Sequence, residues 1–193
     1  MDGELDTRVR AALDRGDTTA AATLLVDELG SELLGYLWLA ARSWGDGDEL
    51  FSRLCERLWR GLPRFRFECP VRTWTYVIAR NLVRTESVRT RKREDVVALA
   101  EVPELIERVA AVRTSTLANT TADALARLEA LRTALDEHDR TLLILRVDRR
   151  MSWRDIAEVL ADGDEDREKV AARLRKRFER VKDRLREQLV REA

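Results

Sequence analysis

The segment Arg72-Thr-Trp-Thr-Tyr-Val-Ile-Ala-Arg-Asn81 indicates a helical fold, because its apolar residues recur with the period of an α-helix. Pro70 favours a helix start, so this helix is expected to run from about Val71 into a series of arginines. Its apolar stripe is Val71, Trp74, Ile78 and Leu82. Since a helix turns about 100° per residue, its opposite side should carry Arg80, Arg84, Ser87 and Arg91. This phase predicts a buried Trp74 and an outward Tyr76 that is available for stacking.

The rest of the chain also predicts helices, with no sustained alternation of period two and no hairpin turn. Asp17 can cap a helix entering at Ala20, and Asp46 or Asp48 can cap another helix, which Pro63 ends. The apolar stripe of that second helix is Leu50, Phe51, Leu54, Cys55 and Leu58. Near the C-terminus, a short helix capped by Ser152, a turn and a long basic helix predict a helix-turn-helix. The long helix is expected to bury Val170, Ala171, Leu174, Phe178, Val181 and Leu185.

Composition favours an all-α protein with two helical domains. Of the 193 residues, 37% are charged and 45% are hydrophobic, and only 3 are proline. The helical pattern loosens over residues 94–118, so we expect a linker there between domains over residues 1–93 and 119–193. No apolar run approaches the ~20 residues that cross a bilayer, and the acidic N-terminus lacks the pattern of a signal peptide. A cytoplasmic location is therefore expected.

Basic residues gather in two zones that suit nucleic acid. Residues 60–93 are rich in arginine and contain aromatic rings, with Glu68 and Glu86 as the only acids. Cations neutralise phosphates and flat rings stack on unpaired bases, so this zone favours opened DNA. The last helix carries a stripe of cations opposite its apolar face, as in a helix that reads the major groove: Lys169, Arg173, Lys176 and Arg180. Because the formal net charge is zero, the free protein should bind DNA weakly.

The chain resembles the extracytoplasmic-function sigma factors, small promoter-recognition subunits of bacterial RNA polymerase. The likeness to their region 2 rests on Trp59-Arg60, Arg64-Phe65, Arg72-Thr73-Trp74 and Ile78-Ala79-Arg80-Asn81. The likeness to their region 4 rests on residues 142–146, Ser152, Ile156-Ala157-Glu158, Leu160, Val170 and Arg173-Leu174. The resemblance implies an alternative sigma factor that binds core RNA polymerase and directs it to promoter DNA, with no cofactor and no metal.

Three contact surfaces follow from this resemblance. The first would bind and melt the minus-ten element, and it consists of Arg72, Tyr76, Arg80, Arg84 and Arg91. The second is the stripe of the last helix, which would read the minus-thirty-five element. The third would dock on core polymerase, and it consists of Glu49, Arg53, Glu56, Arg57 and Arg60. The chain departs from the family at Ser52-Arg53, where a Gln-Glu pair is usual, and at residues 161–168, which form a longer and more acidic turn.

Two other functions fit the same residues. One is a helix-turn-helix transcriptional regulator that binds duplex DNA without polymerase, and the other is a degenerate sigma-like interaction protein. An enzyme is not expected, because the sole histidine, His138, lies between two acids rather than beside a nucleophile. Cys55 and Cys69 do not form a metal-binding pair, and Cys55 should be buried as a small apolar residue. The sequence leaves open whether an anti-sigma factor binds.

Overall fold

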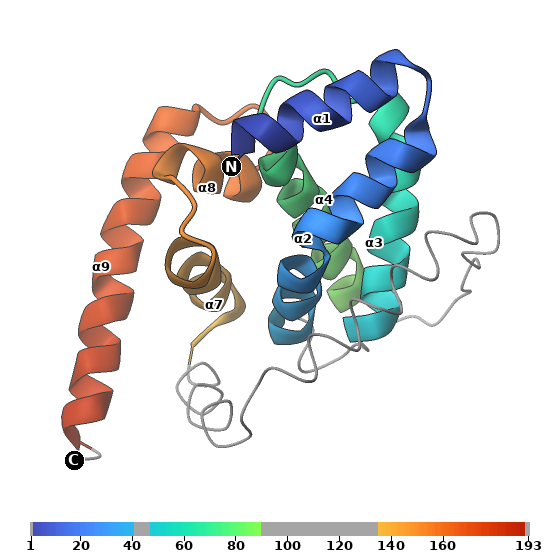
Figure 1. Ribbon diagram of the computed structural model, residues 1–193. Coiled ribbons are helices and arrows are strands. Elements are labelled where there is room, and N and C mark those ends of the chain that lie inside the picture. Colours follow the sequence, from blue (N-terminus) through green and yellow to red (C-terminus); the bar gives the residue numbers. More distant parts are fainter. Residues whose placement is uncertain (1, 41–46, 90–134, 192–193) are drawn as a thin grey trace. The chain divides into compact units, whose positions relative to one another are not determined.

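The computed structural model describes residues 2–40, 47–89 and 135–191, and within these ranges the chain forms helices, turns and loops without any strand. The all-α prediction is therefore confirmed. The chain divides into two compact units, the first ending at Asn119 and the second beginning at Thr120 (Figure 1). The expected linker over residues 94–118 and the candidate residue Arg91 lie outside the described residues.

The described part of the first unit contains α1 (Asp2–Asp14), α2 (Thr18–Ala40), α3 (Gly47–Gly61), the 3-10 turn η1 (Leu62–Arg64) and α4 (Val71–Arg89). Local signals set these bounds. The Oδ1 atom of Asp17 accepts a hydrogen bond from the backbone N–H of Ala20 at 2.8 Å, which caps α2. Pro63 lies in η1, directly after the end of α3. Pro70 immediately precedes α4, and its carbonyl accepts a hydrogen bond from Trp74 N at 3.0 Å. These sequence predictions are confirmed.

In the first unit, α4 packs against α1, α2 and α3, and α2 likewise packs against the other three helices. Large side chains fill the core between these helices, among them Tyr36, Phe51 and Tyr76. Burying a large apolar side chain contributes roughly 1.5–3 kcal/mol to folding. Since α4 meets neighbours on several sides, its polar residues Thr73 and Thr75 are buried as well as its apolar ones.

The second unit contains α7 (Glu137–Leu143), the π-helical turn η2 (Ile144–Asp148), α8 (Trp153–Leu160) and α9 (Arg167–Arg191). The predicted cap of α8 is confirmed, because Ser152 Oγ accepts a hydrogen bond from Asp155 N at 3.1 Å. The hydroxyl of Ser152 also donates to the carboxylate of Asp155. In this unit α9 packs against α7 and α8. Its predicted apolar face is buried at Val170, Ala171, Leu174, Phe178 and Val181 and half-buried at Leu185.

Candidate nucleic-acid interface

The arginines of α4 differ in exposure although the sequence predicted them on one DNA-facing surface. Arg84 is exposed. Arg72 is 18% exposed and pairs with Glu32 of α2, with an Nε–Oε1 distance of 2.8 Å and an Nη2–Oε2 distance of 3.1 Å. Arg80 is only 8% exposed, so the prediction of an outward Arg80 is wrong. The physical reason is that α4 touches three helices, and the side opposite its apolar stripe also meets protein.

Tyr76 is fully buried, so the prediction of an outward, stacking Tyr76 is wrong. Its ring meets that of Tyr36 edge to face, with 5.3 Å between the ring centroids. Its hydroxyl donates a hydrogen bond to Oε1 of Glu32 at 3.3 Å, which gives the buried phenol a polar partner. The same carboxylate binds Arg72, so Glu32 joins α2 to the first two turns of α4.

Trp74, which the sequence placed in the core, is only half-buried. Its ring stacks on Phe65 with 4.6 Å between centroids, and Phe65 in turn lies 4.5 Å from Phe67. We call these three residues the aromatic cluster. It sits at the segment between α3 and α4, where Phe67 has a positive φ of 56°. All three rings are half-buried, so the aromatic cluster, rather than Tyr76, offers aromatic surface beside the arginines of this unit.

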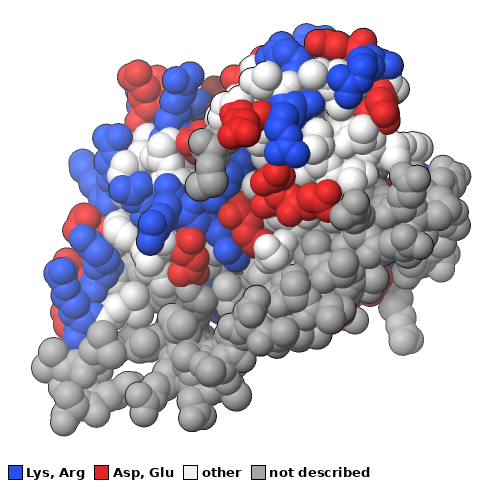
Figure 2. Space-filling view, in the orientation of Figure 1, with Lys and Arg blue, Asp and Glu red and all other residues white. Residues whose placement is uncertain are grey.

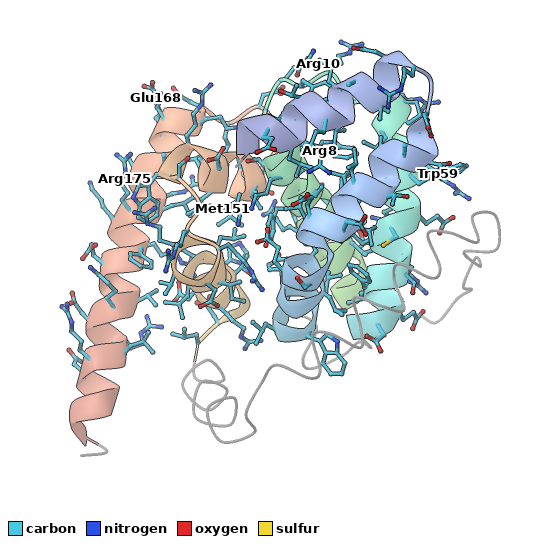
Figure 3. The ribbon with its side chains drawn as sticks, in the orientation of Figure 1. Arg8, Arg10, Trp59, Met151, Glu168 and Arg175 are labelled. Atoms are coloured by element: carbon cyan, nitrogen blue, oxygen red, sulfur yellow. The ribbon has the colours of Figure 1, made fainter. Side chains whose placement is uncertain are left out.

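Two residues of α1 hold this segment, and sequence reasoning missed both. The guanidinium of Arg10, which is labelled on α1 in Figure 3, lies 4.0 Å from the ring centroid of Phe67. The Oδ1 atom of Asp6 accepts a hydrogen bond from Val71 N at 2.8 Å, and so caps α4 across 65 positions of sequence. No local pattern signals a cap supplied from so far away.

Four of the five charged residues of α3 that were predicted to dock on polymerase form pairs along the helix. Glu49 and Arg53 are joined at 2.6 Å, and Glu56 and Arg60 at 2.7 Å, each pair one turn apart. Helix-surface pairs one turn apart contribute about 0.3–0.5 kcal/mol each. Glu49 and Arg60 are exposed, while the side chains of Arg53, Glu56 and Arg57 are half-buried. On the other side of α3, Cys55 is buried as predicted.

In the second unit, the whole predicted basic stripe of α9 is exposed, at Lys169, Arg173, Lys176 and Arg180. Figure 2 shows Lys and Arg side chains gathered along α9, at the left of the view, with Asp and Glu side chains among them. One member of the stripe is already bound: Arg173 Nη1 and Nη2 donate to the two carboxylate oxygens of Glu165 at 2.9 and 3.2 Å. The hydrogen bonds from Arg173, followed by one from Asp162 N, lower the pKa of Glu165, and the same contact raises the pKa of Arg173.

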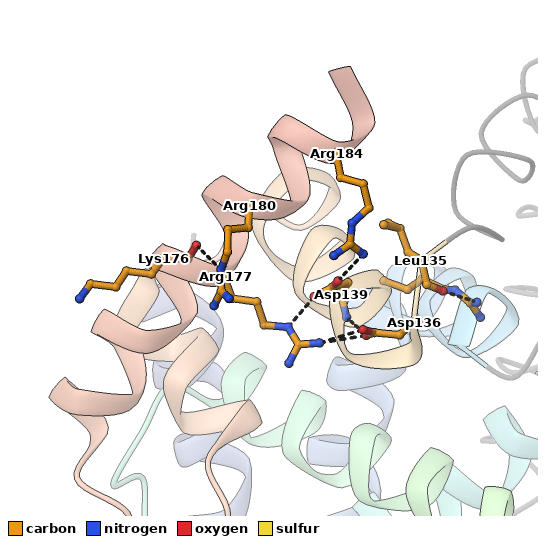
Figure 4. A network of polar contacts seen from close by, with 8 residues as sticks. Leu135, Asp136, Asp139, Lys176, Arg177, Arg180 and Arg184 are labelled. Carbon is orange, nitrogen blue, oxygen red and sulfur yellow. Dashed lines mark hydrogen bonds and ion pairs between the residues drawn. The ribbon is translucent and has the colours of Figure 1, made fainter. Parts of the chain in front are cut away.

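Arg177 neighbours the stripe in sequence but binds α7 instead (Figure 4). Its Nε donates to the carboxylate of Asp139, and its Nη2 lies 3.0 Å from both carboxylate oxygens of Asp136. Arg184 Nη1 contacts the other oxygen of Asp139 at 3.3 Å. The side chain of Asp139 is 4% exposed, so this network holds α9 against α7. Sequence reasoning missed it, although Asp136 in front of a helix was a possible signal, since its Oδ1 caps α7 through Asp139 N at 2.8 Å.

The network also shifts the acidity of its members. Desolvation raises the pKa of Asp136, but the backbone hydrogen bond from Asp139 and the charge of Arg177 together bring it below the ordinary value of 3.8. The hydrogen bond to Asp139 raises the pKa of Arg177. Both shifts favour the charged forms, so the network persists as an ion pair.

Over residues 2–40, 47–89 and 135–191, no three His, Cys, Asp or Glu side chains gather closely enough to hold a metal ion. Within the same ranges, no helix is long and apolar enough to cross a membrane.

Comparison with protein families gives a match within the first unit. Residues 25–94 match the family model described as Sigma-70 region 2. The match begins within α2 and covers all of α3, η1 and α4, and it therefore contains the aromatic cluster and the charged face of α3. This match shows that residues 25–94 are similar to region 2 of the sigma-70 family. Comparison with curated proteins gave no match.

Proposed function

We propose that this protein is an alternative sigma factor of the extracytoplasmic-function group, which binds core RNA polymerase and directs it to specific promoters. The observation that carries the proposal is the region 2 match over residues 25–94, because it contains two of the three candidate contact surfaces. No cofactor is required, since the polymerase performs the chemistry. The protein would act in the cytoplasm, where the bacterial chromosome lies.

In this proposal the first unit binds and melts the minus-ten element. A melted base needs a ring to stack on and cations nearby for the flanking phosphates. The aromatic cluster supplies the rings, and Arg84 supplies an exposed cation on α4. Arg72 acts less directly, because its guanidinium is held by Glu32 and fixes α4 against α2. The paired charges of α3, from Glu49 to Arg60, form the docking surface for polymerase.

The second unit reads the minus-thirty-five element through α9. Its support is geometric: α8, a turn and α9 follow in the order of a helix-turn-helix, and the basic stripe of α9 is exposed opposite its buried face. Long basic side chains on such a face reach both base edges and phosphates in the major groove. The two units would thus contact two separate promoter elements.

Run-off transcription from genomic fragments with core polymerase tests the proposal. We expect discrete transcripts that appear only when this protein is added. A variant with Lys169, Arg173, Lys176 and Arg180 all changed to Ala should lose most of them, while Arg186→Ala, on the same helix but outside the stripe, should keep them. If the protein neither copurifies with polymerase nor changes its start sites, the sigma assignment is wrong.

One observation favours a second function, a transcriptional regulator that binds DNA without polymerase. The basic stripe lies on α9, outside the residues that match region 2. Gel shifts at matched salt, with and without core polymerase, separate the two functions. Tight, sequence-specific binding by the protein alone favours the regulator. Polymerase binding without transcripts would instead favour a sigma-like interaction protein.

A further inference from the structure

The turn between α8 and α9 is held in one conformation by its own hydrogen bonds. Arg167 donates through Nε to Glu158 of α8 at 2.9 Å and through Nη1 to the carbonyls of Gly163 and Glu165 at 3.0 and 2.8 Å. Asp166 caps α9, because its Oδ1 accepts from Glu168 N at 2.9 Å. Gly163 supplies the positive φ of 59° that the turn requires. The turn therefore has a fixed shape.

This fixed turn presents the carboxylate of Glu165 to the recognition face of α9. Oε2 of Glu165 accepts a hydrogen bond from Asp162 N at 3.1 Å, which orients the carboxylate. Both of its oxygens then bind the two terminal nitrogens of Arg173, at 2.9 and 3.2 Å. These are the same two N–H groups with which an arginine binds a phosphate or the edge of a guanine. Glu165 therefore occupies the hydrogen-bond donors with which Arg173 would bind DNA.

We propose that Glu165 is a specificity-determining residue of the second unit, because it keeps Arg173 from binding phosphates of any sequence. Arg173 leaves Glu165 only where its own contact with DNA is stronger than the Glu165–Arg173 ion pair. A bidentate contact with the edge of a guanine in a promoter would meet this condition, whereas a single phosphate contact on random DNA would not. The inference rests on the proposed binding of DNA by α9 and adds a residue that sets its selectivity.

Binding of the full-length protein to a labelled duplex of random sequence, over a range of salt concentrations, tests this inference. Glu165→Gln keeps the size of the side chain and removes its charge, so Arg173 becomes available to a phosphate. We expect tighter binding, on the order of 3- to 10-fold at low salt, and a log–log salt slope steeper by about 0.9, the value for one added phosphate contact. Discrimination between promoter and random duplex should fall.

Two further variants distinguish the effect of the Glu165–Arg173 contact from the effect of removing a negative charge from the turn. Asp164→Asn removes one negative charge from the same turn, at an exposed residue that is not the partner of Arg173, and should change the affinity much less. In the Glu165→Gln background, Arg173→Gln should abolish the gain. Thermal melting by circular dichroism verifies that each variant is folded.

The outcomes separate this inference from the proposed function. If folded Glu165→Gln binds random DNA as the wild type does, or if Asp164→Asn gains as much, the inference is overturned. Glu165→Gln could gain affinity through Arg173 while neither the wild type nor any variant supports transcription with core polymerase. In that case the sigma assignment fails and the role of Glu165 in DNA binding stands.

Discussion

The two basic helices of this protein, α4 and α9, place their arginines in opposite environments. In α4, Arg72 and Arg80 are turned toward neighbouring helices, whereas the stripe of α9 is exposed. The cause is packing: α4 meets α1, α2 and α3, while α9 packs against α7 and α8 and keeps a free face. How many helices pack around a basic helix therefore decides whether its arginines lie in the interior of a unit or on its surface.

The comparison is tested most severely at the aromatic residues of α4. Tyr76→Ala should lower the free energy of unfolding by about 3–5 kcal/mol, because it removes a fully buried ring that packs on Tyr36. Trp74→Ala should cost clearly less, since Trp74 is half-buried. Urea denaturation of both variants measures the difference. Tyr76→Phe, the control that loses only the hydroxyl, should cost about 0.5–1.5 kcal/mol. A Trp74→Ala variant less stable than Tyr76→Ala would show that their burial is reversed.

The anchor of α9 should show the next largest effect. Asp139→Ala leaves Arg177 and Arg184 without their shared carboxylate, which is 4% exposed in the folded protein. Breaking a buried pair costs about 3–5 kcal/mol, but these arginines are themselves partly exposed, so we expect about 2–3 kcal/mol. The matched control is Asp183→Ala, whose partner Arg186 is 72% exposed, and it should stay within about 0.5 kcal/mol of the wild type. Equal losses in thermal melts would rule out the anchoring role of Asp139.

Within α4, the half-buried Arg72 and the exposed Arg84 should separate an effect on stability from an effect on function. Arg72→Ala should lower stability by about 1–2 kcal/mol, because it breaks the paired contact with Glu32. Arg84→Ala should leave stability within about 0.5 kcal/mol and instead reduce promoter opening, since Arg84 is exposed. Chemical denaturation and permanganate footprinting of unpaired thymines measure the two effects. If Arg84→Ala lowers stability as much as Arg72→Ala does, the two arginines do not have separate roles in stability and in promoter opening.

A smaller effect is expected from pH at the α7–α9 network. Because the folded state lowers the pKa of Asp136 below 3.8, its charge stabilises the second unit above that pH. The contribution is lost as the pH falls through the lowered value. Asp136→Asn keeps a good helix cap but cannot ionise, so stability should fall by less than about 1 kcal/mol at neutral pH and decline less steeply in acid. Denaturation curves between neutral and strongly acidic pH measure this. Parallel curves for both proteins would contradict it.

The smallest effect on stability should come from the exposed stripe itself. Lys176→Ala and Arg180→Ala should each change the free energy of unfolding by less than about 0.5 kcal/mol, because both side chains are exposed. Each should nevertheless weaken promoter binding, by about 1–3 kcal/mol where it contacts a base edge. A phosphate contact would instead weaken all sequences alike and flatten the salt dependence. Unchanged transcription in both variants would exclude them from the DNA surface.

Sequence patterns predicted the parts of this fold that depend on near neighbours. The caps at Asp17 and Ser152, the end of α3 before Pro63 and the apolar face of α9 all follow from residues a few positions apart. Periodicity gave the wrong exposure for Tyr76 and Arg80, because it predicts exposure correctly only for a helix with a single buried face. For α4, which packs against three helices, the orientation of each side chain depends on residues such as Glu32, far away in sequence.

The cap that Asp6 places on α4 bears on how the first unit can be divided for experiments. The region 2 match begins at residue 25, but the carboxylate that accepts from Val71 N lies upstream of it, as does the Arg10 guanidinium over Phe67. A fragment cut at residue 25 would expose the side of α2 and α4 that α1 covers and would leave the α4 N-terminus without this cap. The smallest fragment suited to independent folding therefore begins before Asp6, and a family boundary alone is a poor guide for truncation.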